Sequence, residues 1–447
     1  MNVQIVNGHS RSTNAAAILR AIAAASARDV TFPEYFVYDD GRETHFALGV
    51  SRELVIPASA TEADPVAAAA AWSRGLDHRE FAFGYLTYEA LQRPTVGGLA
   101  PGTLPFVHFL VPRTHLRVSP TSLRIDGVPL PAALLAAMEG LLGRTSEDAD
   151  SLEPPALDRA VYLAGGDAYQ RHVRTAMGRI HEGSLDKVVL SRRVHLGADV
   201  DFIRTFIAGY LRSIWYRSFL LQTRHVSATG FSPEILLTAG GDGTISTNPL
   251  AGTRRRGRGE EDDQRMRKEL LRDPKEIKEH VVSVLAVQGE LARVCAKETI
   301  AVTSFMAVRE YSTVQHLSSR VSGRLSPGET LWSALTAIGP GVTVTGIPKQ
   351  DALGCIHHLE SGPRGVYAGA VGYVTGDGRA DLALPIRTIF RDQEGTYLQA
   401  GAGIMAESMP HLEFLETCNK LRAVGEYLRS TPAGVVPGAI PGAMSGE

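Results

Sequence analysis

The sequence predicts an α+β fold in which strands joined by hairpins are interrupted by helices. Alternating apolar and polar residues predict strands at 79–91 ("REFAFGYLTYEAL") and 105–118 ("PFVHFLVPRTHLRV"). Residues 365–404 are typical of a strand meander, with turns at "GDG" and "DQEG". Such hairpin-joined strands argue against a doubly wound parallel sheet, in which single strands and helices alternate.

The remaining elements are predicted from apolar periodicity. An alanine-rich helix is expected near 63–74, and further helices are expected at 166–182, 200–214, 274–297, 329–337, 349–359 and 409–429. Strands are expected at 186–196, 219–231 and 234–241, and 305–325 reads as a strand or a hairpin.

Composition divides the chain into two parts and a tail. The acidic stretch 143–158 contains proline and serine and lacks an apolar period, so it is predicted to connect two halves. Residues 1–150 form the first half, and residues 151–430 carry the stronger signals. The tail at 431–447 has the composition of disorder.

The overall composition excludes several classes of protein. The 447 residues carry a formal net charge of −2, which gives no electrostatic reason to expect nucleic acid or membrane partners. There is no apolar run of about 18 residues, so no transmembrane helix is expected, and the N-terminus lacks the pattern of a signal peptide. The 3 cysteines are far apart and not in CxxC spacing. We therefore expect a reducing, cytoplasmic location and no disulfide framework.

Two pairs of glutamates are the strongest chemical signal in the chain. Glu276 and Glu279 lie three residues apart in one predicted helix, and Glu413 and Glu416 have the same spacing in another. Residues three apart share a helix face, so each pair can present two carboxylates to one point. Converging carboxylates repel one another unless a cation lies among them, and a sparse all-oxygen site suits Mg²⁺. The alternative is two solvated helix faces.

Several segments could bind an anionic ligand of such a site. Arg387 could grip a carboxylate bidentately, and Tyr367 on the partner strand could bond the same group. The alternative for Arg387 is a strand arginine that faces water. The arginine-rich stretch 254–267 is interpreted as a solvated, mobile loop, with a lid over an anionic substrate as the alternative.

Small residues mark places where a ligand could approach the backbone. These are Ala251 and Gly252 in "NPLAGTRRRGRG", Gly401 and Gly403 in "QAGAGI", and Gly346 in "VTVTGIPK", where Thr343 also offers a hydroxyl. For "NPLAGT" taken alone, a plain turn is the better interpretation.

Lys187 and Glu234 are the candidate base and acid. Each leads into an apolar strand, where burial would lower the pKa of the lysine and raise that of the glutamate. Such opposite shifts are what acid–base catalysis needs, although spacing alone does not show that the two side chains face each other.

An ordered set of motifs resembles the chorismate-utilising enzymes. The motifs are "KVVLSR", "GFSPE", "NPLAGTR", "PKEIKEH", "VQHLSS", "TGIPK", "GVYAGAVGY", "IRT", "AGAGI" and "EFLETCNK". That family includes anthranilate, aminodeoxychorismate, isochorismate and salicylate synthases. The resemblance is strong over 160–430, and 1–150 matches as a divergent N-terminal half. It implies a single large anthranilate synthase component I-like unit with two packed, mainly antiparallel sheets surrounded by helices, so that 143–158 would be a loop.

The resemblance also implies a role for each matching residue. Glu279 and Glu416 would bind Mg²⁺, supported by Glu276 and Glu413. Lys187 would be the base and Glu234 the acid, and His316 would line the pocket near the enolpyruvyl group. The substrate chorismate would be held by Gly252, Thr253, Tyr367, Arg387, Gly401, Gly403 and Lys420.

Three positions bear on which family member the chain resembles. Members that add water carry a lysine where Lys187 stands, and members that eliminate pyruvate carry a threonine where Thr343 stands. Asn248 excludes the covalent lysine of some aminodeoxychorismate synthases, but it departs from the glutamate that salicylate synthases often have there. Together these positions are most similar to the salicylate synthases.

The resemblance therefore implies an enzyme that converts chorismate to isochorismate and then to salicylate and pyruvate. An isochorismate synthase without the lyase step, an ammonia-dependent anthranilate-type synthase, and a chain that only binds chorismate are the alternatives. A monomer without a glutaminase subunit is expected, with siderophore or other secondary metabolism as the usual context.

Overall fold

The computed structural model describes residues 2–4, 11–26, 32–60, 64–92, 102–142, 159–212, 216–311 and 314–431. The predicted connection at 143–158 and the predicted disordered tail beyond residue 431 lie outside these residues. Among the described residues, no helix is long and apolar enough to span a membrane.

Each helix predicted from the sequence is present, with ends that differ by a few residues. The helices at 11–26, 88–92, 132–141 and 260–270 were not predicted, and the strand predicted at 79–91 ends at Leu86 because the chain then turns into the helix at 88–92. The described helices are α1 (Arg11–Ser26), α2 (Pro65–Ser73), α3 (Tyr88–Gln92), α4 (Ala132–Leu141), α5 (Gly166–His181), α6 (Phe202–Arg212), α7 (Glu260–Leu270), α8 (Pro274–Leu291), α9 (Leu331–Ile338), α10 (Lys349–Leu359) and α11 (Pro410–Gly425), with 3₁₀ turns η2 (Arg159–Leu163) and η3 (Lys297–Thr299).

Along the chain, runs of several strands are interrupted by helices, as expected for an α+β fold. They are β1 (Asn2–Gln4), β2 (Tyr35–Asp39), β3 (Thr44–Ile56), β4 (Phe81–Leu86), β5 (Val107–Val118), β6 (Ser122–Gly127), β7 (Lys187–His195), β8 (Arg217–Gln222), β9 (Ser227–Ser232), β10 (Ile235–Ala239), β11 (Thr244–Thr247), β12 (Leu250–Arg255), β13 (Ala301–Glu310), β14 (Val314–Arg324), β15 (Gly346–Ile347), β16 (Ala370–Thr375), β17 (Ala380–Ala383), β18 (Thr388–Asp392) and β19 (Gly395–Ile404).

All described strand pairings are antiparallel, and they form two series of neighbouring strands, called limbs here, that share β5. One limb runs β6–β5–β3–β2–β8–β9–β18–β19–β7–β15. The other runs from β5 through β4, β16, β17, β10 and β11 to β14, which also pairs with β12 and β13. The predicted α+β class and antiparallel sheets are confirmed, although the two sheets are hydrogen-bonded into one.

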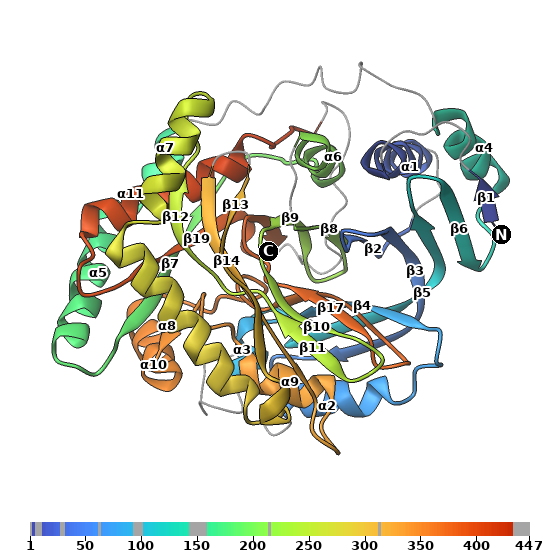
Figure 1. Cartoon of the computed structure of the whole chain (residues 1–447). Helices are drawn as coiled ribbons and strands as arrows, with labels where there is room; N and C mark the ends of the chain where they lie inside the picture. Colours follow the sequence, from blue (N-terminus) through green and yellow to red (C-terminus); the bar gives the residue numbers. More distant parts are fainter. Residues whose placement is uncertain are drawn as a thin grey trace.

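The main core lies between the limbs, and helices cover their outer faces (Figure 1). Phe36 and Tyr38 of β2 enter this core with Phe83 and Tyr85 of β4. The intervening Val37 of β2 points to the opposite face, where a second cluster packs against α1, α4 and α6. The period-2 alternation of these strands is therefore what assigns their side chains to two cores.

The two glutamate-bearing helices begin at well-defined residues. The Asp273 side chain caps α8 by accepting hydrogen bonds from the backbone N–H groups of Lys275 at 2.9 Å and Glu276 at 3.2 Å, and Pro274 occupies the first turn. Pro410 likewise occupies the first turn of α11. These starts place both acidic pairs in the first two turns of their helices.

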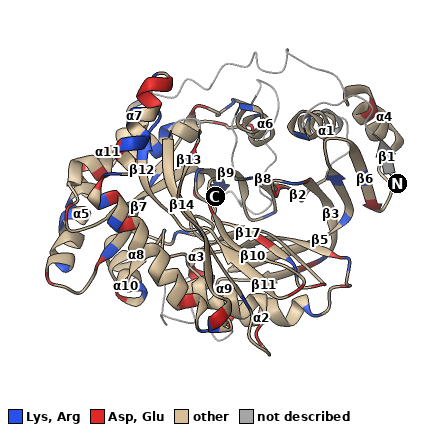
Figure 2. Ribbon diagram, in the orientation of Figure 1, with Lys and Arg blue, Asp and Glu red and all other residues tan. Residues whose placement is uncertain are grey.

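The interpretation of 254–267 as a loop is wrong for most of its length, and only residues 256–259 connect a strand to a helix. Arg254 and Arg255 end β12, and Arg265 and Arg267 lie in α7, whose first turn is acidic and whose last turn is basic (Figure 2). Arg256 and Arg258 lie in the connection between the two elements. Arg255 pairs with Asp262 at 3.0 Å, and Arg256 pairs with Asp263, so acids three to seven residues away neutralise the arginines locally. The alternative of a lid over an anion also loses most of its argument, since every arginine of this stretch except Arg258 pairs with an acid.

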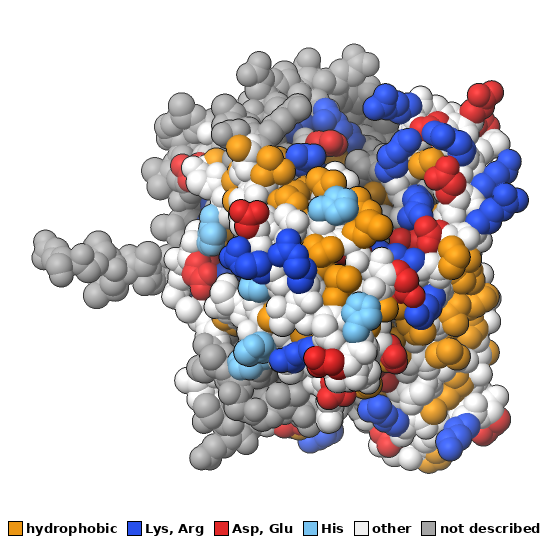
Figure 3. All heavy atoms as spheres, turned by 90° about the vertical axis from the view of Figure 1, so that its left-hand side faces the viewer, with side chains coloured by type: hydrophobic (Ala, Val, Ile, Leu, Met, Phe, Trp, Pro, Cys, Tyr) orange, Lys and Arg blue, Asp and Glu red, His pale blue; other side chains and the backbone are white. Residues whose placement is uncertain are grey.

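Apolar side chains are also exposed on the face that α5, α8, α10 and α11 share (Figure 3). Met409, Leu412 and Leu415 are 54%, 50% and 45% exposed, and their spacing of three residues aligns them on one side of α11.

Candidate active site

A cavity between β7, β12, β14, β19, α8 and α11 contains most of the predicted site residues. Its wall combines charged, polar and glycine residues from segments that are far apart in the sequence. The predicted residues that line it are Glu234, Gly252, Thr253, Glu279, His316, Thr343, Tyr367, Arg387, Gly401, Gly403, Glu416 and Lys420. The other three, Lys187, Glu276 and Glu413, are buried beside these residues and do not form the cavity wall.

The glutamates of α8 are held by contacts with several donors. Glu276 accepts a hydrogen bond from the backbone N–H of Thr253 at 2.7 Å and pairs with Arg254 at 3.3 Å. Burial and the neighbouring Glu279 nevertheless raise the pKa of Glu276 to about 7. Additional positive charge near this pair would therefore stabilise the ionised carboxylates.

The glutamates of α11 face the same region. Glu413 is 2% exposed and pairs with Lys275 of α8 at 2.9 Å, which links the two helices. Burial and Glu416 raise the pKa of Glu413. Burial also disfavours ionised Glu416, but the ion pair with Lys420 at 2.7 Å outweighs this effect and lowers the pKa of Glu416.

The chemistry of this donor set fits Mg²⁺, because four carboxylates from two helices supply oxygen ligands alone. Their ligand atoms do not yet converge on one point. Among the described residues, the group of three potential ligands within 4.8 Å of one another is Glu34, Glu53 and His108, and Arg224 already pairs with both of its carboxylates. Each glutamate of the site instead has its own lysine or arginine partner, so cation binding would require these side chains to exchange partners.

Lys187 is fully buried at the start of β7. Its ammonium pairs with Oε1 of Glu279 at 3.0 Å and donates to Oγ of Ser283 at 3.2 Å. The predicted base Lys187 is thus paired with the predicted metal ligand Glu279 and does not itself line the cavity. A role as a proton acceptor requires that Lys187 lose this ion pair, because the carboxylate stabilises the ammonium form.

Glu234 lies at the cavity wall and is 4% exposed. Burial raises its pKa to about 8, despite hydrogen bonds to Oε1 from the Thr343 hydroxyl at 2.6 Å and the Leu250 N–H at 3.2 Å. The carboxyl group therefore keeps its proton at neutral pH, as a general acid must. The sequence singled out Thr343 and Glu234 separately, and only the structure brings them into contact.

Arg387 is the clearest anion-binding group of the cavity. It is 7% exposed, has a left-handed backbone φ of 55°, and its guanidinium has no hydrogen-bond or ion-pair partner among the described residues. Burial lowers its pKa, which shows that its charge is poorly compensated. The expectation that it is a strand arginine facing water is wrong. Tyr367, also predicted, is 3% exposed in the same wall.

His316 leaves one ring nitrogen available to a ligand. Its Nδ1 bonds with the hydroxyl of Thr253 at 2.9 Å, whereas its buried Nε2 has no partner. Burial lowers the pKa of His316 to about 3, so the ring is neutral. An orphaned polar atom in a cavity wall indicates that a ligand or water satisfies it.

Two of the predicted glycines are required for close approach. Gly252 has a φ of 84°, which favours glycine. At Gly403, an added Cβ would lie 2.3 Å from Oε1 of Glu279, so any side chain there would displace that carboxylate. At the neighbouring Gly401, the backbone carbonyl accepts a hydrogen bond from Lys420 at 2.8 Å, which fixes the lysine against the cavity.

Sequence reasoning missed the residues that brace the cavity from behind. Arg364 is 2% exposed and donates to the carbonyls of Val344 at 2.6 Å and Val189 at 2.8 Å, both of which line the cavity. Its partner Glu360 accepts from the N–H of Ser191 at 2.6 Å. Arginine next to glycine in "PRGVY" gave no signal of this role, since the contacts come from distant segments.

Together these groups make the cavity suitable for an anion and for acid–base chemistry. It offers an uncompensated buried arginine, a protonated carboxyl group, a neutral histidine and an acidic end that would favour a cation. All of these are brought together from segments between residues 187 and 420.

Comparisons with known proteins bear on the family and the fold of the chain. Residues 33–426 match the family model described as chorismate binding enzyme. The chain is 38% identical over 349 residues to salicylate synthase of Mycolicibacterium paratuberculosis, which covers 78% of this chain and 74% of that protein. Anthranilate synthase component 1 of Thermus thermophilus is 39% identical over 271 residues, which cover 60% of this chain but only 58% of that relative.

Solved structures show the same fold. The crystal structure of anthranilate synthase component I from Streptococcus pneumoniae superposes with a TM-score of 0.68 at 26% identity, covering 86% of this chain and 92% of that one. The menaquinone-specific isochorismate synthase of Escherichia coli gives 0.68 at 20% identity, covering 96% and 94%. The second likeness concerns the fold alone. The predicted anthranilate synthase component I-like fold is confirmed.

Proposed function

We propose, since the chain belongs to the family of chorismate-binding enzymes, that it is a Mg²⁺-dependent salicylate synthase. It would convert chorismate to isochorismate and then to salicylate and pyruvate. The observation that carries the proposal is the shared cavity of Arg387, which has no acidic partner among the described residues, and Glu234, whose pKa is raised to about 8. An anionic substrate and a general acid are what the first step needs.

Binding of the substrate would use both ends of the cavity. Glu276, Glu279, Glu413 and Glu416 would hold Mg²⁺, which when bound would neutralise the ring carboxylate of chorismate. Arg387 and Tyr367 would orient the enolpyruvyl carboxylate, because a guanidinium binds a carboxylate through two parallel hydrogen bonds. The unpartnered Nε2 of His316 would complete this part of the wall.

The first step would exchange a hydroxyl group between two ring carbons. Lys187 would take a proton from the water that attacks C2, and Glu234 would give its proton to the hydroxyl that leaves C4. Lys187 must be neutral for this, so its ion pair with Glu279 must open during the reaction. The products of the step are isochorismate and one molecule of water.

The second step would divide isochorismate into two products. The hydrogen on C2 moves to the methylene carbon of the enolpyruvyl group, the C3–O bond breaks, and pyruvate leaves as the ring becomes aromatic. No acid or base is required, so the chain would contribute mainly by confining the substrate in a productive conformation.

Three features support salicylate as the final product. The salicylate synthase relative aligns over 78% of this chain. Lys187 is the residue expected for addition of water, and Thr343 is the residue expected for elimination of pyruvate. Asn248 departs from the pattern of that group; its side chain donates to the carbonyl of Ser319 at 3.1 Å, and it does not line the cavity.

The test is to incubate the purified chain with chorismate and Mg²⁺, with and without ammonium, and to identify the products by chromatography and mass spectrometry. Salicylate with equimolar pyruvate is expected, and Lys187→Ala should abolish both products while its circular dichroism spectrum stays unchanged. Isochorismate alone would show a synthase without the lyase step. Anthranilate formed with ammonium would refute activation of water by Lys187.

A further inference from the structure

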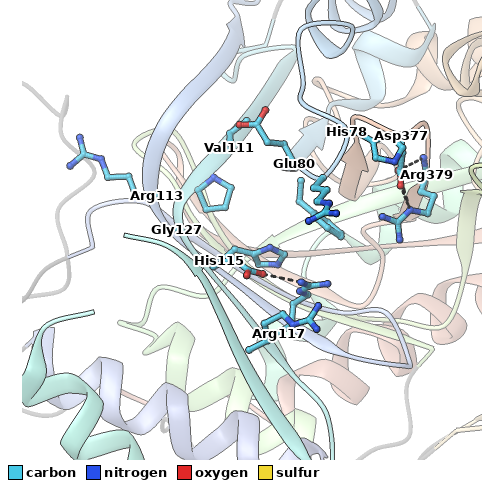
Figure 4. A pocket seen from close by; sticks show the side chains of 14 residues that line it. His78, Glu80, Val111, Arg113, His115, Arg117, Gly127, Asp377 and Arg379 are labelled. Atoms are coloured by element: carbon cyan, nitrogen blue, oxygen red, sulfur yellow. Dashed lines mark hydrogen bonds and ion pairs between the residues drawn. The ribbon is translucent and has the colours of Figure 1, made fainter. Parts of the chain in front are cut away.

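The strand β5 contributes to two groups of polar side chains outside the active-site cavity. Toward its end it lines a hollow in which Asp126 pairs with Arg117 at 2.9 Å and Asp377 pairs with Arg379 at 2.8 Å (Figure 4). Because these acids and arginines are already paired, the hollow gives no argument for a ligand. His108, near the start of the same strand, belongs to a different group, in which several buried atoms have no partner.

Glu34, Glu53 and His108 form this second group, which we call the histidine–glutamate cluster. Glu34 directly precedes β2, Glu53 lies in β3, and His108 lies in β5. The strand β3 pairs with both β2 and β5, and Val55 lies opposite His108, so Glu53 is a diagonal neighbour of His108 on the same face. One potential ligand atom of each residue lies within 4.8 Å of the others. The sheet therefore brings three segments together at one point.

Four buried polar atoms at this cluster have no hydrogen-bond partner. They are Nδ1 and Nε2 of His108, Nε2 of His225 and the hydroxyl oxygen of Tyr85. The His108 ring is 1% exposed, and its centroid lies 5.7 Å from that of His225 and 6.0 Å from that of Tyr85. The described residues contain 12 such atoms in all, so a third of them are gathered here. Buried polar atoms normally have partners, so this concentration points to a ligand.

The contact between His108 and Glu53 has the spacing of two ligands of one metal ion. Nε2 of His108 lies 3.2 Å from Oε2 of Glu53, but the two atoms do not form a hydrogen bond. Burial lowers the pKa of His108, so the ring is neutral at pH 7 and the contact is not an ion pair. Two ligands of a tetrahedral zinc ion, each about 2.1 Å from the metal, lie roughly 3.4 Å apart.

Arg224 is the cation that the two carboxylates of the cluster hold in this structure. Its guanidinium lies 3.2 Å from Glu34 and 2.8 Å from Glu53. Two carboxylates and one guanidinium leave a net charge of −1, and the nitrogens of His108 stay unpaired. A divalent cation would neutralise both carboxylates and also bind the imidazole. The Arg224 side chain is 37% exposed, so its guanidinium can move into solvent without leaving a buried charge.

We propose that the histidine–glutamate cluster binds a zinc ion, which takes the place of the Arg224 guanidinium. Imidazole nitrogen together with carboxylate oxygen suits Zn²⁺, whereas Mg²⁺ prefers oxygen ligands. His225, whose Nε2 is unpartnered, is the candidate for a fourth ligand. The ion would tie the turn between β8 and β9, which contains His225, to β2, β3 and β5 and would stabilise the fold. The site shares no residue with the active-site cavity, so the proposal does not rest on the proposed function.

The experiment is isothermal titration calorimetry of the untagged, chelator-treated full chain with Zn²⁺. Glu53→Gln removes a ligand at a partly exposed position, and His108→Ala removes the nitrogen ligand. Glu80→Gln is the matched control, because the Glu80 side chain is 29% exposed against 32% for Glu53 and pairs with a different arginine. The double variant Glu279→Gln/Glu416→Gln removes the carboxylates of the active-site cavity that could also bind a cation.

Zn²⁺ is expected to bind one site with the same affinity in the wild type, the control and the active-site double variant. It should bind Glu53→Gln and His108→Ala at least about tenfold more weakly. Arg224→Ala should bind Zn²⁺ more tightly than the wild type, because the competing guanidinium is gone. Zn²⁺ should also raise the Tm of the wild type but not that of Glu53→Gln, since a ligand of the folded state stabilises it.

Several results would overturn the proposal. They are a wild type that binds no Zn²⁺, a Glu53→Gln chain with wild-type affinity, and binding that is lost in the active-site double variant but kept in Glu53→Gln. Weaker binding by Arg224→Ala would refute replacement of the guanidinium. Circular dichroism checks the fold of each variant, and Glu53→Gln decides the outcome if His108→Ala does not fold. None of these measurements depends on turnover of chorismate.

Discussion

A few buried side chains whose charge is set by their neighbours determine the chemistry of the site. Glu234 is kept protonated by burial, Arg387 keeps an uncompensated charge, and His316 is neutral. In water at neutral pH, the carboxyl group of Glu234 would be ionised, the guanidinium of Arg387 would be charged, and the ring of His316 would be protonated in part of the molecules. Before any ligand binds, the cavity therefore contains a protonated carboxyl group, and its arginine has no ion pair among the described residues.

The pKa of Glu234 predicts the basic limb of the pH–rate profile. The acid works only when protonated, so kcat should fall about tenfold per pH unit above about pH 8. Glu234→Gln should be inactive, because an amide cannot give the proton. Steady-state rates between pH 6 and 10, with circular dichroism to confirm folding, check this; a rate that keeps rising through pH 9 would contradict it.

Thr343→Ala should change both the pH profile and the products. The Thr343 hydroxyl bonds to Oε1 of Glu234 and favours its ionised form, so its loss should raise the pKa of Glu234 and move the basic limb to higher pH. Isochorismate release should also increase relative to salicylate. Thr345→Ala is the matched control, since that hydroxyl bonds to the carbonyl of Gly341. An unchanged limb and product ratio would remove Thr343 from the mechanism.

Arg387→Met should weaken the grip on the substrate. Loss of charge-assisted hydrogen bonds worth about 1.5–3 kcal/mol should lower kcat/KM for chorismate by roughly 10- to 150-fold. Arg309→Met, an exposed arginine of β13, should leave kcat/KM unchanged. Equal values for both variants would show that Arg387 does not contact the substrate.

At the scale of elements, α8 and α11 define the acidic end of the cavity. Lys275 of α8 pairs with Glu413 of α11 at 2.9 Å, so the two helices are tied together at the point where the acidic pairs meet. Neither helix provides a metal site alone, because each contributes only one acidic pair.

Metal binding should depend on both helices. Glu279→Gln and Glu416→Gln should each weaken Mn²⁺ binding, measured by electron paramagnetic resonance as a stand-in for Mg²⁺, by about tenfold or more. Removal of metal by a chelator should stop turnover, and added Mg²⁺ should restore it. Glu407→Gln is the control, because that side chain is 52% exposed and pairs with Lys278. Equal Mn²⁺ affinity in all variants would refute the proposed site.

The Arg364–Glu360 pair braces β7 and the segment around Val344 behind the cavity. Breaking a buried pair leaves an unpaired charge, so Arg364→Leu should lower the free energy of unfolding by about 3–5 kcal/mol. Arg52→Leu breaks the more exposed pair with Glu80, where the arginine is 45% exposed, and should cost about 0–1 kcal/mol. Urea unfolding compares the two variants. Similar small losses would show that the buried pair is not a structural brace.

At the scale of the whole molecule, the two halves of the chain share their sheets. Strand β2 of the first half pairs with β8 of the second, and β4 pairs with β16. The core between the limbs contains side chains from both halves. The predicted boundary near residue 150 therefore does not separate two independent cores.

A fragment of residues 151–431 should accordingly fail to fold by itself. It would leave the edges of β8 and β16 unpaired and expose half of the core, so we expect no cooperative thermal transition and early elution in size-exclusion chromatography. The full chain under the same conditions is the control. A fragment that melts cooperatively as a monomer would show that the N-terminal half is a separate domain.

The sequence predicted well what depends on local pattern. Apolar periodicity predicted the helices from residue 166 onward, with one exception, and the strand meander at 365–404. The exception is α7 at 260–270, which has so many charged residues that it shows no apolar period. Apolar periodicity did not reveal α1 and α4 either, whose apolar residues run too continuously to show a helical period.

What the sequence determined by itself was the inventory of the site: ordered motifs, two acidic pairs, a candidate acid, a candidate base and an arginine for an anion. Only the tertiary structure decided how these groups act on one another. It placed Lys187 against Glu279 and Thr343 against Glu234, and it left Arg387 without an ion pair among the described residues. The reason is physical: charge and protonation depend on burial and on neighbours from distant segments, which residue spacing along the chain does not specify.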